Sequence, residues 1–348
     1  MIVTNSKALP EPIHMAIKYG DKYDGYGTLS VTTLIEPPKQ WILKKKHADD
    51  IHVDVSEMMW AMFGSACHSF IEGAKLSDKS RYVIEKRMRY IVDDTTVSGK
   101  MDLLDLNGAT FDPSTMIIRG GKIWDYKVSS VWSYIFRDEK DAWIKQLNFY
   151  ATLLRNVGFM FTQEDVDNGD NIVLGHAVPA NTPVRVYPSE ASIVLIMRDW
   201  QRKKAEYELD YPRSQVEEIP VHLYDDAELW AKFNARITYF LEVSKYVANG
   251  GDVHHTSLDC TDKDMWGTGQ TYKVKSSMTA ARAYPYGSFS TKDYPDAEDR
   301  AIAFQRQKAA AGQPAFIQLV NAEYRKCSSF CMVREFCQQR IRNNIPLL

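Results

Sequence analysis

The pattern of apolar and polar positions along the chain predicts strands and helices in alternation. A period of two occurs around Val83–Lys86 and again from Val97 to Leu104, and it predicts strands there. Short apolar strands are also predicted at about 122–128 and 191–198. Helical patterns are predicted over about 31–46, 56–74, 141–156, 199–209 and 222–249. This order of elements is typical of an α/β fold.

The predicted elements divide the chain into three parts. We expect an N-terminal segment over residues 1–50 that packs on the core, a core over 51–250, and a cysteine-containing region over 251–348. A turn-rich insertion over 107–121 interrupts the core, and the Asn-Gly and Gly-Gly pairs at its ends are typical of hairpins or loops. The region from His254 onward is loop-rich, so we expect it to pack on the core rather than to fold alone.

The bulk composition is that of an ordinary globular protein. Of 348 residues, 45% are hydrophobic and 25% charged. The longest strongly apolar run, Ser192–Met197, is too short to cross a bilayer, and the N-terminus lacks the pattern of a signal peptide. We therefore expect a cytoplasmic protein, in a bacterial or phage-infected cell, that makes no membrane contact.

The net charge of −2 argues against a general nucleic-acid binder, although a local basic patch can still grip phosphates. Candidate patches are Lys44–Lys46, Arg81 with Lys86, Arg87 and Arg89, and Arg198 with Arg202, Lys203 and Lys204. Each of these, taken alone, is more typical of a solvated charged surface.

Four short motifs follow one another in the predicted core. They are Gly64-x₃-His68-x₃-Glu72, Gly99-x₂-Asp102, Asp125-x-Lys127 and Gln146-x₃-Tyr150. Residues four apart share a helix face, which groups His68 with Glu72 and Gln146 with Tyr150. Neighbouring strands lie about 4.8 Å apart, so we expect Asp102 and Asp125 to converge on one point.

This set of residues suits the hydrolysis of a phosphodiester. The reaction needs a hydroxide near neutral pH and relief of charge on phosphorus, and two Mg²⁺ or Mn²⁺ ions supply both. Asp102 and Asp125 are candidate ligands, His68 can reach the same ions from its helix, and the main-chain carbonyl of Tyr126 would complete the set. Lys127 lies on the same face as Asp125 and can orient the attacking water or offset phosphate charge.

The motifs, in this order, resemble the PD-(D/E)XK nuclease superfamily, and specifically its RecB-like exonuclease branch. The resemblance covers roughly residues 30–210 and implies a restriction-endonuclease-like mixed central sheet flanked by helices, with the metal site at the sheet edge. It implies that His68, Asp102 and Asp125 bind metal and that Lys127 is the catalytic lysine. Gln146 and Tyr150 would form the supporting motif. Glu72 matches less closely, and it would hold a second ion through water.

The spacing Cys327-x₃-Cys331-x₅-Cys337 indicates a metal site, because close cysteines in a reducing compartment are a poor basis for disulfides. It resembles the C-terminal cluster of iron–sulfur RecB-like nucleases, where a fourth cysteine precedes the metal-binding helix and the site holds [4Fe–4S]. This chain has no cysteine in the corresponding stretch, 34–42.

Cys260, in a polar loop, is the favoured fourth ligand, and Cys67 is the alternative, although packing explains Cys67 better. Four thiolates suit either Zn²⁺ or an iron–sulfur cluster, and spacing does not choose between them. In either form the site would be a structural staple of the C-terminal region. Three unliganded thiols in a terminal helix are the simpler alternative.

The expected function is a divalent-metal-dependent DNA nuclease, with an exonuclease of recombination, repair or phage replication favoured. The alternative is a non-catalytic DNA-binding or assembly module on a nuclease scaffold. The chain has no phosphate-binding loop of the helicase type, so any unwinding would need a separate partner, such as a recombination or single-strand-binding protein. Three aromatic residues after the Asp125 strand either stack on DNA bases or face the core: Trp132, Tyr134 and Phe136. The sequence leaves open polarity, strand preference, endonuclease action and oligomeric state.

Overall fold

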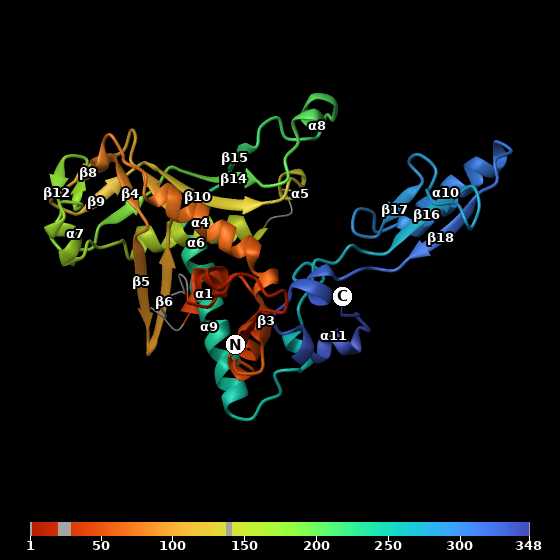
Figure 1. Cartoon of the computed structure of the whole chain (residues 1–348), viewed down its shortest axis with the longest axis horizontal. Coiled ribbons are helices and arrows are strands. Elements are labelled where there is room, and N and C mark those ends of the chain that lie inside the picture. Colours follow the sequence, from red (N-terminus) through yellow and green to blue (C-terminus); the bar gives the residue numbers. More distant parts are fainter. Residues whose placement is uncertain (1, 20–28, 137–140, 348) are drawn as a thin grey trace. The chain divides into compact units, whose positions relative to one another are not determined.

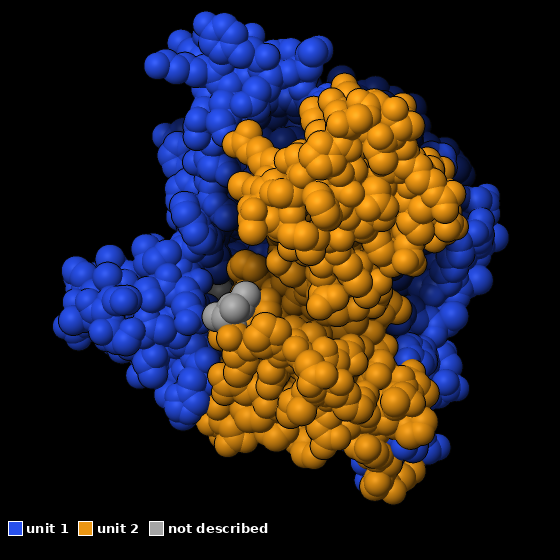
Figure 2. Space-filling view, turned by 90° about the vertical axis from the view of Figure 1, so that its right-hand side faces the viewer, with its two compact units in different colours: residues 1–36, 52–248 blue, residues 37–51, 249–348 orange. Residues whose placement is uncertain are grey.

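The computed structural model describes residues 2–19, 29–136 and 141–347. The chain divides into two compact units, which Figure 2 colours separately. Unit 1 comprises Met1–Glu36 and His52–Ala248, and unit 2 comprises Pro37–Ile51 and Asn249–Leu348. The change of unit at Ala248 falls beside the boundary that we expected near residue 250. Residues 37–51, however, belong to unit 2, whereas the sequence placed them in an N-terminal segment on the core.

The main sheet of unit 1 is mixed. It has five strands in the order β15-β14-β10-β7-β4, and only the central pair β10 and β14 is parallel. The bounds are Val216–Pro220 for β15, Glu190–Met197 for β14, Lys122–Ser129 for β10, Leu103–Asp105 for β7 and Tyr82–Ile84 for β4. Most of β14 is buried, in keeping with its apolar sequence. The mixed α/β class expected from the sequence is therefore present.

Four smaller sheets accompany the main one in unit 1. They are β2-β6-β5 (Leu29–Ser30, Thr95–Lys100, Arg87–Val92), β13-β9-β8 (Arg185–Tyr187, Ile117–Arg119, Thr110–Asp112), β1-β3 (Ile2–Thr4, His52–Asp54) and β11-β12 (Ile172–Val173, His176–Ala177). The insertion over 107–121 thus contains a hairpin, β8-β9, rather than turns alone.

The helices of unit 1 are α1 (Glu11–Tyr19), α2 (Val31–Leu34), α4 (Met59–Glu72), α5 (Trp132–Ile135), α6 (Asp141–Asn156), α7 (Gln163–Asp167), α8 (Arg202–Tyr207) and α9 (Asp226–Ala248), with 3₁₀ turns at Val55–Glu57 and Lys79–Arg81. Helices α4 and α6 both pack against β10 (Figure 1). Leu147, Leu153 and Leu154 of α6 are fully buried, and each such side chain contributes about 1.5–3 kcal/mol to the core.

Unit 2 is more ordered than the sequence suggested. It contains α3 (Pro38–Lys46), the sheet β17-β16-β18 (Ser288–Ser290, Thr271–Lys275, Phe316–Val320), α10 (Ala297–Ala310), α11 (Gln338–Arg342), a π-helical turn at Lys326–Phe330 and 3₁₀ turns at Thr256–Leu258 and Arg334–Phe336. The loop-rich interpretation of the tail was therefore wrong for 271–320.

The single helix expected over 31–46 is two helices, α2 and α3. Pro37 is extended (ψ 135°) and Pro38 has no amide hydrogen, so the helical hydrogen bonding is interrupted between α2 and α3. Among the described residues, no helix combines the length and apolar character needed to cross a membrane.

Candidate active site

A bend shared by two strand pairs builds one side of the candidate site. Strands β4 and β7 belong to the main sheet, whereas their continuations β5 and β6 belong to a second sheet. Pairing continues across the bend, because Glu85 N donates to Asp102 O (3.1 Å) and Met101 N donates to Lys86 O (3.3 Å). Asp102 thus lies in the bend between β6 and β7, whereas the sequence pattern had placed it in a strand.

Glu85 has an unusual backbone conformation at this bend. Its φ of 51° lies in the left-handed region, which costs a non-glycine residue on the order of 1–3 kcal/mol and recurs at functional sites. The conformation redirects the side chain as a β-bulge does. Lys100 forms an ion pair with the Glu85 carboxylate. The residue with the strained backbone, Glu85, is thus the one whose carboxylate lies beside Asp102.

His68, Glu85 and Asp102 form a group that can bind a metal ion. One ligand atom from each lies within 4.8 Å of the other two. His68 comes from α4, and its Nε2 donates to the main-chain oxygen of Tyr126 at 3.0 Å. Its Nδ1 lies 3.6 Å from Asp102 Oδ2, which also accepts from Tyr126 N at 2.7 Å. A helix, a bend and the backbone of β10 thus converge.

Asp125 is the centre of the second half of the site. Its side chain is 2% exposed, and Oδ2 lies 2.7 Å from Lys127 Nζ. Gln146 Nε2 of α6 donates to Asp125 Oδ1 (3.2 Å) and to the Tyr150 hydroxyl (2.9 Å). The motif residues of α6 therefore hold the carboxylate that β10 carries.

Gly99 is needed where Tyr150 packs against β6. A Cβ at this position would lie 3.0 Å from Leu153 and Val31 carbons and 3.1 Å from Tyr150 Cδ1. These distances are shorter than ordinary contacts, so the glycine permits close approach of α6 to the strand.

The two aspartates interact electrostatically. Trp124 of β10 pairs with Leu103 of β7, so the next positions in the same antiparallel register are Asp125 and Asp102. Burial raises the pKa of the Asp102 carboxyl from 3.8 to about 7, and the charge of Asp125 contributes to the rise. Asp125 Oδ2 accepts no hydrogen bond with good geometry from the described residues. Two buried carboxylates with this electrostatic cost fit a divalent cation, which would offset it.

Glu72 does not join this group. It ends α4, is exposed, and is not among the described residues whose ligand atoms converge with His68. The nearby carboxylate is Glu85, which the sequence analysis missed. Its only sequence signal is an acidic residue within a short alternating strand pattern, and this does not reveal a positive φ.

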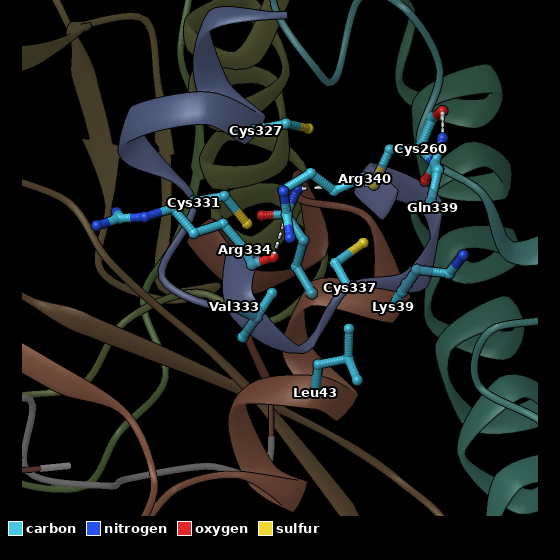
Figure 3. Close-up of a pocket in the computed structure, with 11 residues that line it drawn as sticks. Lys39, Leu43, Cys260, Cys327, Cys331, Val333, Arg334, Cys337, Gln339 and Arg340 are labelled. Carbon is cyan, nitrogen blue, oxygen red and sulfur yellow. Dashed lines mark hydrogen bonds between the residues drawn. The ribbon is translucent and has the colours of Figure 1, made fainter. Parts of the chain in front are cut away.

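A separate pocket in unit 2 brings together four of the five cysteines (Figure 3). Cys260, Cys327, Cys331 and Cys337 line it, with Lys39, Gln40 and Leu43 of α3 among the other lining residues. Cys67 lies on α4 of unit 1 and takes no part. The structure therefore groups Cys260, rather than Cys67, with the C-terminal three.

Hydrogen bonds fix Cys260 in this pocket. Gln339 clamps its backbone, since Cys260 N donates to Gln339 Oε1 and Gln339 Nε2 donates to Cys260 O, both at 2.8 Å. Gln40 Nε2 lies 3.8 Å from its sulfur. Beside it, the buried ammonium of Lys39 pairs with Asp259. The loop that carries Asp259 and Cys260 thus contacts both α3 and α11 through these two residues.

The thiols of the pocket are electrostatically coupled. Burial raises the pKa of Cys260 to about 11 and that of Cys327 to about 12, and neighbouring thiols add to both shifts. Burial also raises the pKa of Cys331. Without a bound metal these three thiols are therefore protonated at neutral pH, and metal binding would release their protons.

A single tetrahedral ion would hold four closely spaced sulfurs. With Zn–S bonds of 2.3 Å, tetrahedral geometry places sulfurs about 3.8 Å apart. Among the described residues, however, no three cysteine sulfurs lie within 4.8 Å of one another.

No family model matches the chain, and no curated protein matches it significantly. A solved structure described as "Crystal structure of SSO0001" is similar over 65% of this chain and 82% of its own length, at 13% identity and a TM-score of 0.35. So weak a likeness carries no argument. The described residues form a mixed α/β protein with a carboxylate–histidine group and a pocket lined by four cysteines.

Proposed function

We propose that this chain is a divalent-metal-dependent deoxyribonuclease of the PD-(D/E)XK, RecB-like type, and most readily an exonuclease of recombination, repair or phage replication. One observation carries the proposal: Asp102 and Asp125 stand opposite each other in the register of β7 and β10, with Lys127 Nζ 2.7 Å from Asp125 and His68 and Glu85 around Asp102. The order of motifs in the sequence and this geometry agree.

The residues that would hold Mg²⁺ or Mn²⁺ are His68, Glu85, Asp102 and Asp125, together with the carbonyl of Tyr126. When bound, such ions lower the pKa of water and offset charge on the phosphoryl oxygens. Glu85 replaces Glu72 in this set. His68 Nε2 lies 3.0 Å from Tyr126 O, so both atoms could contact one ion once the ring carries its proton on Nδ1 instead.

The other residues position these ligands and bind the phosphate. Lys127 carries the positive charge closest to Asp125, and its side chain is partly exposed, so it can hold a water or a phosphate oxygen. Gln146 fixes the orientation of Asp125 through Oδ1 and is itself braced by Tyr150. Asp125 therefore keeps Oδ2 directed toward Lys127 and the site.

We further propose that the cysteine pocket holds an iron–sulfur cluster that stabilises unit 2. Four thiols from two segments line one pocket, and four thiolates are the ligand set of an iron–sulfur cluster. Its role would be structural, because α3, the loop at Cys260 and the C-terminal turns meet there. Hydrolysis is assigned to unit 1 alone.

The direct test is DNA cleavage by the full chain with Mg²⁺ or Mn²⁺, on linear, end-blocked and circular substrates. Asp125→Ala and Lys127→Ala should each lose cleavage by about 100-fold or more, as expected for groups that act on the reacting phosphate. Lys145→Ala, which removes an exposed lysine one residue before Gln146, is the matched control and should cleave normally.

Undiminished cleavage by Asp125→Ala or Lys127→Ala would contradict the proposal. Binding of DNA by the wild type without cleavage, across several divalent ions, would support a non-catalytic module instead. Degradation of linear DNA without degradation of circular DNA would identify an exonuclease.

A further inference from the structure

We propose that Trp132 and Phe136, with Trp60 and Arg198, form a stacking surface that binds single-stranded DNA beside the candidate active site. The inference rests on the proposed function and narrows its substrate to unpaired strands. All four residues lie in unit 1. We refer to them as the aromatic surface.

The first part of the aromatic surface is a pair of parallel rings on α5. Trp132 is 61% exposed and Phe136 48% exposed, which excludes the core-facing alternative for these two residues. Their ring centroids lie 5.9 Å apart at an interplanar angle of 16°. Exposed apolar side chains grouped in this way mark interaction sites. Stacked aromatic faces suit nucleobases of any sequence.

The second part lies on α4 and at the end of β14. Trp60 is 58% exposed, the guanidinium of Arg198 stands 4.2 Å from its ring centroid, and Phe63 meets the ring edge-on at 6.3 Å. An arginine over an indole ring is a cation–π pair, and the same arrangement can hold a base or a phosphate.

Both parts lie at the same end of β10. Arg198 N donates to Ser129 O (3.0 Å), at the last residue of β10, three residues before α5 begins. His68 reaches Tyr126 of β10, and Trp60 lies eight residues earlier on α4, about 12 Å along the helix. Ser129 lies three residues beyond Tyr126, about 10 Å along the strand. Both parts of the aromatic surface therefore lie about 10–12 Å along α4 and β10 from the residues of the candidate active site.

Charge at this end of the sheet favours a polyanion. Arg198, Arg202, Lys203 and Lys204 are exposed, and none forms an ion pair with a described side chain. The one carboxylate among them, Asp199, accepts from Val131 N at 2.7 Å and so anchors the start of α5. Glu206 in α8 and Glu208 just after it reduce the net charge there. Arg198, which contacts the Trp60 ring, would hold a phosphate while bases stack, and the three cations that follow it in the chain add positive charge.

The choice of single strands follows from which base faces are accessible. In a duplex the faces of the bases are stacked on one another, whereas unpaired bases can turn onto aromatic side chains. A surface made of ring faces therefore discriminates between the two forms. A surface made of cations alone would bind both.

The test compares binding of labelled oligo(dT) and of a blunt duplex of equal length by fluorescence anisotropy, with the full chain in EDTA so that no cleavage occurs. Trp132→Ala combined with Phe136→Ala should weaken single-strand binding by about tenfold or more and leave duplex binding within twofold. Trp132→Phe should retain single-strand affinity, because a phenyl ring still stacks. Tyr286→Ala, which removes a ring that is 93% exposed in unit 2, is the control and should change neither.

Unchanged single-strand binding by the double variant would overturn the inference, as would an equal loss on both substrates. Failure of the proposed function is distinguishable from this. A wild-type chain that cleaves no DNA with any divalent ion, yet shows the selective single-strand loss, contradicts nuclease action and supports the aromatic surface. Cleavage that persists in the double variant with unchanged substrate preference supports the nuclease and overturns the surface.

Discussion

Nε2 of His68 lies 3.0 Å from the main-chain oxygen of Tyr126, so a helix and a central strand present two ligand-type atoms to the same point. Asp102 and Glu85 approach this point from the bent strands. A site assembled from three separate elements depends on each of them. Substitutions that remove one ligand without disturbing the elements are therefore the most informative.

Glu85→Gln should reduce metal binding and cleavage, whereas Glu72→Gln should not. The amide of glutamine keeps the shape but removes the charge that a hard cation needs. We expect a loss of at least tenfold in Mn²⁺ affinity for Glu85→Gln, measured by calorimetry, and no change beyond twofold for Glu72→Gln. A larger loss of Mn²⁺ affinity in Glu72→Gln than in Glu85→Gln would instead assign the ligand role to Glu72, as the motif suggested.

Asp102→Asn should stabilise the metal-free protein at pH 8. The folded-state pKa of about 7 is above the unfolded value of 3.8, so protonation of Asp102 stabilises the fold. This contribution is complete below about pH 4 and is lost as pH rises through 7. Asparagine resembles the protonated form, so the variant should melt at a higher temperature than the wild type at pH 8 in EDTA, and by a smaller margin at pH 5.5.

Two controls accompany this pH measurement. Asp112→Asn removes an exposed carboxylate whose pKa is lowered by hydrogen bonds from Ser114 and Thr115, so it should not stabilise the protein at pH 8. Added Mn²⁺ should raise the melting temperature of the wild type but not of Asp102→Asn. A wild type that is more stable than Asp102→Asn at pH 8 without metal would contradict the burial of an unfavourable charge.

Gly99→Ala and Gly64→Ala should change stability in opposite directions. The new methyl at 99 would press on Val31, Leu153 and Tyr150, and overpacking of this kind costs about 1–3 kcal/mol. The methyl at 64 meets nothing within 4 Å, and alanine stabilises a helix interior by roughly 0.5–1 kcal/mol over glycine. Urea denaturation of both variants measures this. Equal stability of Gly99→Ala and wild type would show that Tyr150 does not need the close approach.

Replacement of any one pocket cysteine by serine should remove the proposed cluster. Cys260→Ser, Cys327→Ser, Cys331→Ser and Cys337→Ser should each lose iron and the broad absorbance near ~400 nm after anaerobic purification. Cys67→Ser should retain both, because Cys67 lies on α4 outside the pocket. Zinc without colour in the wild type would instead assign a tetrahedral ion, and no metal at all would leave four structural thiols.

The parts of the fold with long, regular patterns were predictable. Helix α6 begins at Asp141 and ends at Asn156, as its pattern indicated, and β14 lies within one residue of its expected bounds. The helix expected over 31–46 was wrong because the period was followed across Pro37, although two adjacent prolines break a helix. The sheet β17-β16-β18 was missed because its strands are short and pair across as many as 49 residues.

The site divides in the same way. Lys127 follows Asp125 on one strand face, so its proximity to that carboxylate could be predicted from period-two alternation. The role of Glu85 could not be predicted, because its position depends on a positive φ at a bend between two sheets. No local residue pattern requires that positive φ. Cys260 was identifiable because a thiol in a polar loop has little reason to be there for packing.

The assembly of unit 2 from two distant segments has a consequence for synthesis on the ribosome. Lys39 is buried and pairs with Asp259, a residue 220 positions later, and Gln40 lies against the sulfur of Cys260. During translation α3 therefore emerges long before its partners, and its ammonium and amide stay hydrated until the last hundred residues follow. Nascent chains that stop before Asn249 lack Asp259 and Cys260, the partners of Lys39 and Gln40, which exposes α3 to chaperones or proteases.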